Sequence, residues 1–249
     1  MRLLENLYYY IWQGKGNNCN SYLFTGVLRG YRPHVMIDPG QVMNEMKEPC
    51  LDILLSEMSN DGFNPEDIGL IINTHAHYDH FGASQTLAAR SRARAGKPKQ
   101  TLLTMYEGEA EYLKMAAEYM AKMPGMPAQQ AVFEPNFYLK EGELHLGKDE
   151  SKVSLHVIHT PGHTPGSISL YWPDQRVLIT GDLLFYGAVG RTDFGGDGRQ
   201  LKQSIERLSG LDVEYLLPGH STEFGSIIKG KDKVEQNFAA VRLNYFPML

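Results

Sequence analysis

The first part of the chain alternates short apolar runs with turn residues. The runs at 7–13, 20–25 and 34–38 are separated by glycine and asparagine, and this arrangement predicts short strands of one sheet. In the next stretch, Asn44 to Asn60, the apolar residues recur instead at helical spacing: Met46, Cys50, Leu54, Leu55 and Met58. We therefore expect an amphipathic helix there that covers the sheet.

An alanine-rich stretch from Gly82 to Ala95 predicts a second helix, and basic residues gather at its end. They are Arg90, Arg92, Arg94, Lys97 and Lys99. Positive charge is favourable at a helix C-terminus, where it meets the negative end of the helix dipole. We interpret the run as a solvated helix end, with contact to RNA as the second interpretation.

The second half of the chain repeats the pattern of the first. Apolar or alternating runs at 139–146, 153–159, 167–171 and 176–180 predict a second set of strands, and a turn is expected at Glu141-Gly142. A closing helix is expected at about 231–244. The composition shows no linker between the halves, so we expect residues 1–249 to form a single domain.

The segment 105–131 is the most individual part of the chain. One helical face of it is apolar or aromatic, acidic residues occupy its first turn, and it ends in the stiff sequence MPGMP. The face consists of Tyr112, Leu113, Ala116, Tyr119, Met120 and Met123. Such a stripe is typical of a helix packed on a core. An insert of this kind also suits a lid or the wall of a substrate groove, and both interpretations stay open.

Charge and cysteine content restrict the class of protein. The formal charge is −5, from 24 basic and 29 acidic residues, which argues against a strongly cationic nucleic-acid binder. No apolar run is long enough for a membrane span, and the N-terminus lacks the pattern of a signal peptide. Cys19 and Cys50 lack metal or redox spacing, so we expect buried thiols rather than a disulfide. These features predict a soluble, cytoplasmic protein.

The chemistry is concentrated in Leu70 to His80, which reads LIINTHAHYDH. A short apolar run leads directly into three histidines and an aspartate, as expected of a strand that ends in a metal-binding loop. His75 and His77 stand at i, i+2 and can bind one ion, while Asp79 and His80 face a second position. Imidazole and carboxylate ligands without thiolates suit zinc, iron or manganese. A run of surface histidines is the alternative interpretation.

The sequence THAHYDH resembles the metal-binding motif of the metallo-β-lactamase superfamily. That resemblance implies three further ligands, and the chain has a matching residue for each in the expected order: His163 in HTPGHTPGS, Asp182 in LITGD and His220 in YLLPGH. It also implies a fold, the α/β four-layer αββα sandwich of two mixed sheets. Asp38, in MIDPG, matches an aspartate that supports the metal loop in the family, although a plain turn is an equal alternative.

The ligand set that the resemblance implies has two parts. His75, His77 and His163 would hold the first metal, Asp79, His80 and His220 the second, and Asp182 would be shared. We expect two divalent ions, with zinc first and iron or manganese as alternatives, and catalytic roles for Asp79 and Asp182. Two ions bring +4, and two carboxylates with one hydroxide remove three, so a net charge of about +1 favours an anionic substrate. His34, His145, His156 and His159 receive no metal role.

A narrower resemblance follows Asp182. The segment LLFYGAVGRTDFGGDGRQL is similar to glyoxalase II-like thioesterases, especially short forms, and to persulfide dioxygenases. Arg191 and Asp193 are expected to form an ion pair that braces this loop, and Tyr186 to reach the site mouth. Residues 221–249 provide a turn and one helix, so we expect the glutathione-binding C-terminal domain of full-length glyoxalase II to be missing.

These observations predict a dinuclear metal hydrolase, most similar to a short glyoxalase II-like thioesterase. Water on a metal, its pKa lowered toward neutrality, would attack the acyl carbon of a small anionic thioester. A mononuclear iron persulfide dioxygenase is the alternative, and phosphodiesters or lactones suit the same attack. Neither a membrane nor a nucleic acid is expected as a partner, and the oligomeric state stays open.

Overall fold

The computed structural model describes residues 1–91, 101–121, 134–147 and 153–249. The chain divides into two compact units. The first unit comprises residues 1–105, 113–138 and 146–153, and the second comprises residues 106–112, 139–145 and 154–249. Each unit is built around one mixed sheet.

The sheet of the first unit has the strand order β1-β2-β3-β4-β5-β6-β7. The strands are β1 (Arg2–Leu4), β2 (Leu7–Tyr10), β3 (Ser21–Phe24), β4 (His34–Ile37), β5 (Ile68–Ile72), β6 (Leu102–Tyr106) and β7 (Phe137–Leu139). Pairing is antiparallel from β1 to β4 and parallel from β4 to β6. The sheet is therefore mixed, as the sequence predicts.

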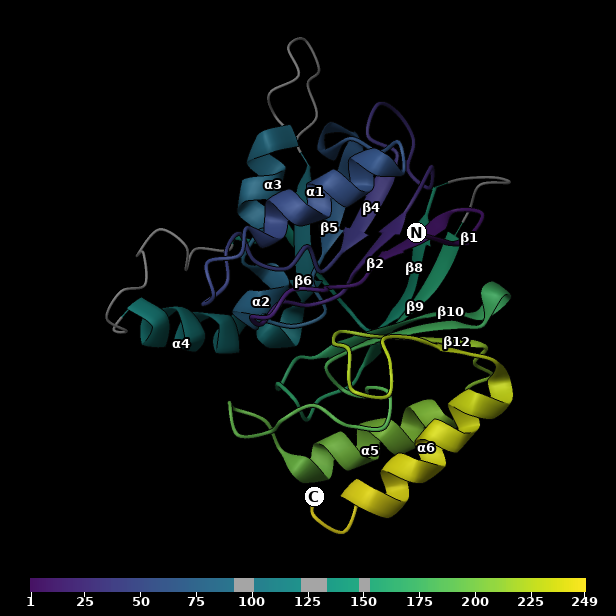
Figure 1. Ribbon diagram of the computed structural model, residues 1–249. Helices are drawn as coiled ribbons and strands as arrows, with labels where there is room; N and C mark the ends of the chain where they lie inside the picture. The colour runs from purple at the N-terminus through teal and green to yellow at the C-terminus, as the bar shows by residue number, and fades with distance from the viewer. Residues whose placement is uncertain (92–100, 122–133, 148–152) are drawn as a thin grey trace. The chain divides into compact units, whose positions relative to one another are not determined.

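The helices α1 (Cys50–Asn60) and α3 (Ser84–Ser91) of the first unit pack on strands of this sheet (Figure 1). The 3-10 turn η1 (Pro65–Asp67) precedes β5, and the short α2 (Tyr78–Phe81) precedes α3. Cys50, Leu54 and Met58 of the predicted apolar face are buried, whereas Met46 precedes the helix and is 58% exposed. The helix begins only at Cys50, not at Asn44, because Asn44 instead accepts backbone N–H groups of a tight turn that leads to Pro49.

The sheet of the second unit has the order β13-β12-β11-β10-β9-β8. The strands are β8 (Gly142–Leu146), β9 (Val153–His159), β10 (Ile168–Trp172), β11 (Val177–Gly181), β12 (Tyr215–Pro218) and β13 (Ile228–Lys229). The pair β11 and β12 is parallel, whereas β10 runs antiparallel to both β9 and β11. The 3-10 turn η5 (Pro173–Gln175) joins β10 to β11.

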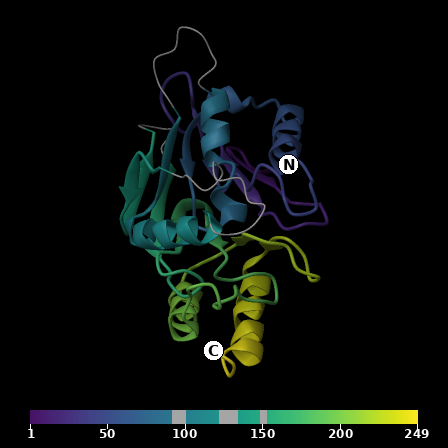
Figure 2. The same ribbon diagram turned by 90° about the vertical axis from the view of Figure 1, so that its left-hand side faces the viewer.

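Two long helices, α5 (Gly198–Ser209) and α6 (Lys231–Tyr245), lie side by side in the second unit (Figures 1 and 2). They share a core with the strands that includes Leu201, Ile205, Leu178 and Phe238. The helix α6 is predicted from the sequence, whereas α5 is not. Asp197 caps α5 through a 2.9 Å bond from the Gln200 N–H, so a start signal was present in the sequence.

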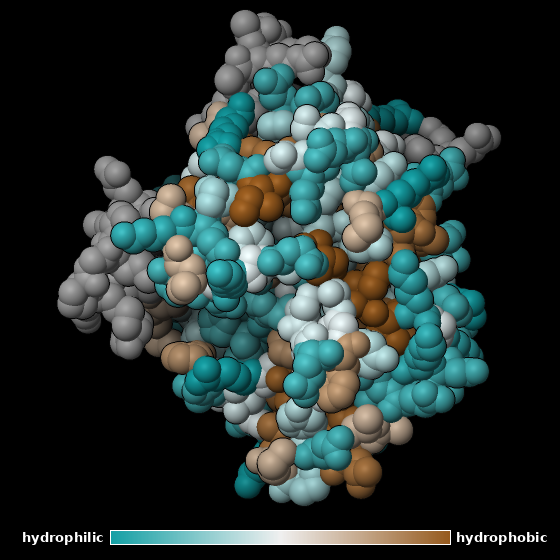
Figure 3. Space-filling view, viewed as in Figure 1, coloured by the Kyte–Doolittle hydropathy of each residue, from teal (hydrophilic) through white to brown (hydrophobic). Residues whose placement is uncertain are grey.

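The segment after β6 forms the 3-10 turn η2 (Glu107–Glu109) and the helix α4 (Ala110–Ala121). Leu113 of the predicted apolar face is buried. The side chains of Tyr119 and Met120, and residues 122–133, lie outside the described part, as do residues 92–100 of the basic run. On the face drawn in Figure 3, brown apolar residues are interspersed with teal hydrophilic ones.

The α/β fold class with two mixed sheets is confirmed by this architecture. No helix in the described ranges is long and apolar enough to cross a bilayer. Both cysteines are buried and free, as predicted, and burial raises the pKa of the Cys19 thiol to about 12 and that of the Cys50 thiol to about 11. Neither thiol is therefore ionised near neutral pH.

Candidate metal centre

The metal motif of the first unit begins where two parallel strands end. β4 and β5 are in register with Met36 opposite Ile71 and Ile37 opposite Ile72, and all four side chains are fully buried. Because parallel strands end at the same edge, the residues that follow them lie together at that edge. Asp38 follows β4 and its N–H donates to Ile72 O at 3.0 Å, so its carboxylate lies beside the loop that follows β5.

Asp38 has a buried carboxylate that accepts hydrogen bonds from the loop after β5. Its Oδ1 accepts the N–H of Thr74 and its Oδ2 accepts the Thr74 hydroxyl, both at 2.7 Å. His80 Nδ1 lies 2.9 Å from the same Oδ2. The residue is 2% exposed and adopts a left-handed backbone with φ 48°. The supporting role that the resemblance implies for Asp38 is confirmed by these contacts.

These bonds determine which ring nitrogen of two histidines points away from the support. The single hydroxyl hydrogen of Thr74 goes to Asp38, so His75 Nδ1, at 3.0 Å from Thr74 Oγ1, must be the donor of that bond. His80 likewise donates its Nδ1–H to Asp38. In both imidazoles the basic nitrogen is then Nε2, and a basic ring nitrogen is the kind of atom that coordinates a metal ion.

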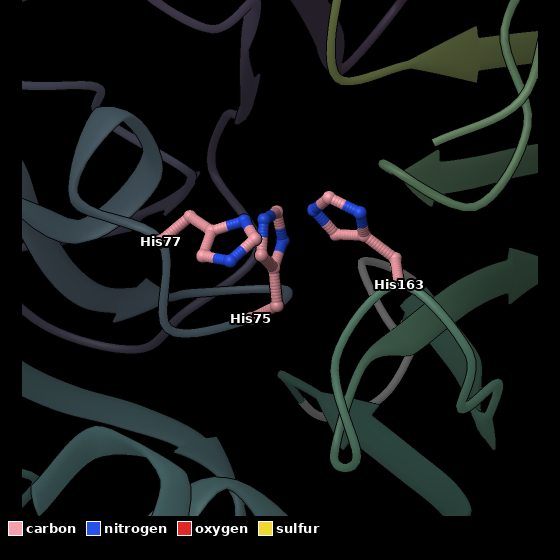
Figure 4. A group of neighbouring side chains, drawn as sticks. All are labelled: His75, His77 and His163. Atoms are coloured by element: carbon pink, nitrogen blue, oxygen red, sulfur yellow. The ribbon is translucent and has the colours of Figure 1, made fainter. Parts of the chain in front are cut away.

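The four candidate ligands of this loop lie near one another. His75 and His77 each offer a ring nitrogen, and these atoms lie within 4.8 Å of each other, as do the ligand atoms of Asp79 and His80. The rings of His75 and His77 lie 4.9 Å apart in an edge-to-face arrangement, which Figure 4 shows for the loop after β5. His163, also labelled there, is a residue of the second unit. His80 lies close to His75 as well, with 4.1 Å between the ring centroids.

The second unit repeats the edge arrangement with its own parallel pair. β11 and β12 are in register, with Leu178 opposite Leu216 and Gly181 opposite Pro218, and Gly219 N–H donates to Gly181 O at 2.8 Å. Asp182 and His220 therefore follow neighbouring strands. His220 Nε2 lies 3.2 Å from Asp182 Oδ2.

His163 approaches the same carboxylate from the loop between β9 and β10. Its Nε2 lies 3.6 Å from Asp182 Oδ2, so that one oxygen faces both imidazoles. His163 Nδ1 lies 2.6 Å from the backbone carbonyl of Arg191, which accepts the Nδ1–H and leaves Nε2 as the basic nitrogen. The backbone of the segment after Asp182 thus orients the histidine that precedes it in the chain.

Glycines make the close packing of this loop possible. Gly162 has φ 136°, and a Cβ there would lie 2.2 Å from Leu201 N of α5. At Gly190 a Cβ would lie 1.7 Å from the carbonyl oxygen of Asp182. Any larger residue at either position forces the His163 loop or the Asp182 strand end to move.

Glu109 is a supporting residue for which the sequence suggested only a favourable place near a helix dipole. It is fully buried, and its carboxylate accepts the hydroxyl of Thr164, the residue after His163. Thr164 Oγ1 also lies 2.6 Å from Ser167 Oγ. Gly166 packs so closely that a Cβ there would lie 2.3 Å from Glu109 N. The proline and glycine residues around His163 predict a rigid loop, but they do not identify Glu109 as its partner.

Other predictions concern the segment around this loop. Arg191 and Asp193 form the predicted ion pair, with Nε 2.9 Å from Oδ1. His159 lies in β9 as expected, and its Nε2 is 2.9 Å from Pro165 O. The ring of Tyr186 lies against that of Phe224, at 6.3 Å between centroids. Its predicted position at the site mouth stays a prediction.

Comparison with known proteins places this arrangement in a family. A family model described as the metallo-beta-lactamase superfamily matches residues 14–220, a range that includes all seven candidate ligands. The chain belongs to the metallo-beta-lactamase superfamily. Family membership confirms the resemblance to the superfamily that the loop after β5 carries.

Three curated relatives are hydrolases by name, and one of them is named as a metallo-hydrolase. A probable metallo-hydrolase of Methanocaldococcus jannaschii is 31% identical over 83% of this chain and 89% of its own length. A hydroxyacylglutathione hydrolase of Haemophilus influenzae is 31% identical over 63% of this chain and 70% of its own. A human acyl-coenzyme A thioesterase is 29% identical over 85% of this chain and 76% of its own. These relatives support metal-dependent hydrolysis.

Solved structures agree on the superfamily fold. A metallo-beta-lactamase family protein of Thermus thermophilus covers 99% of this chain and 81% of its own, with a TM-score of 0.69 and 20% identity. A protein crystallised in a di-iron-bound form covers 93% of this chain and 95% of its own, with a TM-score of 0.61 and 28% identity. The first comparison concerns the fold alone.

Proposed function

We propose that this chain is a dinuclear metal-dependent hydrolase of small thioesters, similar to short glyoxalase II-like enzymes. The observation that carries the proposal is the position of Asp182. One of its oxygens lies 3.6 Å from His163 Nε2 and 3.2 Å from His220 Nε2, and these histidines belong to different ligand sets. A carboxylate so placed is suited to bridge two cations.

The donor atoms fit two divalent ions. Bonds to Thr74, Asp38 and Arg191 O engage the Nδ1 atoms of His75, His80 and His163, so these rings keep a basic Nε2. Neutral imidazole and carboxylate, without thiolate, are ligands for zinc, iron or manganese. We propose His75, His77 and His163 as ligands of the first ion, Asp79, His80 and His220 as ligands of the second, and Asp182 as the shared ligand.

Bound metal ions would supply a water of lowered pKa as the nucleophile and would polarise the acyl oxygen. The protein's part is to hold the ligands rigidly in a site of small positive charge. Asp38 contributes to this rigidity because its buried carboxylate accepts three hydrogen bonds, two from Thr74 and one from His80. Asp79 and Asp182 are the two anionic ligands, and their limited number leaves the site attractive to an anionic substrate.

The leaving group explains why no separate general acid is needed. A thiol has a pKa near 8.5, so a thiolate departs without full protonation at neutral pH. Phosphodiesters and lactones have more basic leaving groups. The names of two relatives, a hydroxyacylglutathione hydrolase and an acyl-coenzyme A thioesterase, describe thioester substrates and support the same choice.

The test combines metal content with oxygen dependence. Purified chain is loaded separately with zinc, iron and manganese, and metal per chain is measured by mass spectrometry. Release of thiol from S-lactoylglutathione and from a short acyl-coenzyme A is followed without oxygen. We expect about two metals per chain and oxygen-independent release. One iron per chain, oxygen uptake with glutathione persulfide and no thioester cleavage would instead identify a dioxygenase.

Two further expectations remain proposals. We propose that residues 1–249 act as a single domain, and that the segment 105–131 contributes a wall of the substrate groove. Met115 of α4 is 57% exposed, so an apolar contact surface is available on this helix. Met115→Ala should raise KM for longer acyl groups and leave the melting temperature unchanged. A lower melting temperature with unchanged kinetics would assign the helix to the core alone.

A further inference from the structure

The loop between β2 and β3 has a backbone fixed by two carboxylates. Glu48 accepts the N–H groups of Lys15 at 3.0 Å and Gly16 at 2.8 Å, and Glu45 accepts the N–H of Asn17 at 2.8 Å. Three successive donors of an exposed loop are thus held by the segment before α1. Charge-assisted bonds of this kind are stronger than those between neutral groups, so the loop has a defined conformation.

The ends of the same loop are fixed as well. The Trp12 indole donates its Nε1–H to Gly16 O at 2.7 Å, and Gln41 Nε2 donates to Asn17 O at 2.5 Å. Gln41 also donates its backbone N–H to Asn18 Oδ1 at 3.0 Å. Gln41 lies three residues after Asp38, so the loop is attached to the strand end that supports the metal motif.

The side chain of Asn17 makes one contact of particular interest. Its Nδ2 donates to Oδ2 of Asp79 at 2.8 Å. Both residues belong to the first unit, and Asn17 itself is exposed. An amide donor aimed at a candidate metal ligand from a rigid loop is the arrangement of an outer partner that orients a ligand.

We propose that Asn17 is a positioning residue for Asp79, and the inference rests on the proposed role of Asp79 in the second metal site. A carboxylate on a short side chain can rotate about its terminal bond. The Asn17 amide occupies one carboxylate oxygen and thereby fixes the plane of the group before a metal binds. The conformational entropy of the Asp79 carboxylate is then lost on folding rather than on metal binding, and metal binding is favoured as a result.

A purely structural role predicts a different result from substitution. Asn17 packs into no core, because its side chain is exposed, and its backbone bonds survive a change of side chain. Asn17→Ala therefore removes the bond to Asp79 and creates no cavity. Asn17→Asp keeps the shape but places a second carboxylate against the first.

The experiment is a zinc titration of the metal-free chain against a chelating indicator, which resolves the two equivalents without any substrate. Removal of an outer partner of a ligand typically lowers metal affinity about 10–100-fold. We expect Asn17→Ala to weaken the second equivalent by about 10-fold and Asn17→Asp by more, with the first equivalent unchanged. Gln13→Ala, an exposed change on the same loop, is the matched control and should bind zinc as the unmutated chain does.

The outcomes separate this inference from the proposed function. If the unmutated chain binds two zinc equivalents and Asn17→Ala binds each of them as tightly as the unmutated chain does, the positioning role is wrong and the hydrolase proposal stands. Equal weakening of both equivalents, or a lower melting temperature of the metal-free variant, also contradicts it, because the loop would then support the fold in general. A single equivalent in the unmutated chain overturns the dinuclear site and this inference together.

Discussion

The two units use the same backbone device to present ligands but support those ligands by different means. In each, two parallel strands in register end at one sheet edge: β4 with β5 in the first, and β11 with β12 in the second. In the first unit a buried carboxylate, Asp38, binds side chains of the metal loop. In the second, a backbone carbonyl of Arg191 orients His163, and close glycine packing fixes the surrounding loop.

The difference shows what kinds of support a sequence can encode locally. A carboxylate that accepts three hydrogen bonds depends on one residue type at one position. A carbonyl oxygen is supplied by any residue, so its position depends on the path of the backbone and on the glycines that permit it. Substitution of Asp38 should therefore act through side-chain chemistry, whereas substitution of Gly162 or Gly190 should act through backbone geometry.

The largest effect is expected at the ligand that faces two histidines. Asp182→Asn retains the shape of the side chain but loses its charge and one anionic oxygen. We expect both metal equivalents to bind more weakly and thioester turnover to fall by at least about 100-fold. Loss of an outer partner of a ligand lowers affinity or activity by up to about 100-fold, and Asp182 is proposed as a ligand itself.

Metal content per chain and kcat measured on the same sample check this expectation. Asp174→Asn, in the exposed turn between β10 and β11, is the control. Full metal content with near-normal turnover in Asp182→Asn would remove the shared-ligand assignment.

The next largest effect is expected from Asp38→Asn. The amide would place a donor against Thr74 or His80, which themselves donate to this position. An unsatisfied buried polar group costs about 1–3 kcal/mol, and metal affinity should fall about 10–100-fold. Urea unfolding of the metal-free variant and zinc titration measure the two effects separately. An unchanged unfolding midpoint would show that Asp38 does not support the loop before metal binds.

Glu109 provides the corresponding test in the second unit. Glu109→Leu removes the acceptor of the Thr164 hydroxyl at similar volume, whereas Glu109→Gln keeps one acceptor oxygen and serves as the matched variant. We expect Glu109→Leu to destabilise folding by about 1–3 kcal/mol and to weaken the metal equivalent that involves His163 by about 10-fold. Equal behaviour of the two variants would assign Glu109 to packing only.

The smallest effect concerns a pH-dependent ion pair between two residues outside the proposed ligand set. The bond from Arg207 holds the pKa of Glu141 below its ordinary value of 4.5. A depressed folded-state pKa stabilises the protein above the ordinary value, and this contribution is lost as pH falls through the lower, folded-state pKa. Both side chains are substantially exposed, so the contribution is at most about 1 kcal/mol.

Thermal unfolding as a function of pH tests this pair. Glu141→Gln should flatten the stability curve below about pH 4.5 and leave it parallel to that of the unmutated chain at neutral pH. A constant difference across the whole pH range would assign the effect to the backbone bond from His159 N–H to Glu141, rather than to charge.

The sequence is most informative where the candidate ligands directly follow a strand in the chain. The run from Leu70 to His80 predicts both β5 and the pairing of His75 with His77, because the periodicity of an extended backbone is local. His163, Asp182 and His220 stand on separate strand ends, and only the resemblance identified them as a group. The contact of Asp182 with His220 depends on the register of β11 and β12, and its contact with His163 depends on the path of the loop between β9 and β10. No local sequence pattern specifies either.

The features that escaped prediction have different causes. The cap at Asp197 and the spacing of Leu201, Ile205 and Leu208 are local signals that indicate the helix α5. The contacts of Glu109 and Asn17 are long-range in sequence, at 55 and 62 residues from their partners. A single chain without related sequences contains no signal for such pairs.

The backbone of Asp38 has a consequence for engineering. With φ at 48°, the position favours glycine, asparagine or aspartate, since other side chains are strained in the left-handed region. Glycine lacks the acceptor, and asparagine lacks the second anionic oxygen. A randomised library at this codon, selected for metal retention, should return aspartate almost alone, whereas a library at Asn17 should tolerate several donors. We therefore expect that redesign of the neighbouring loops requires aspartate to be kept at position 38.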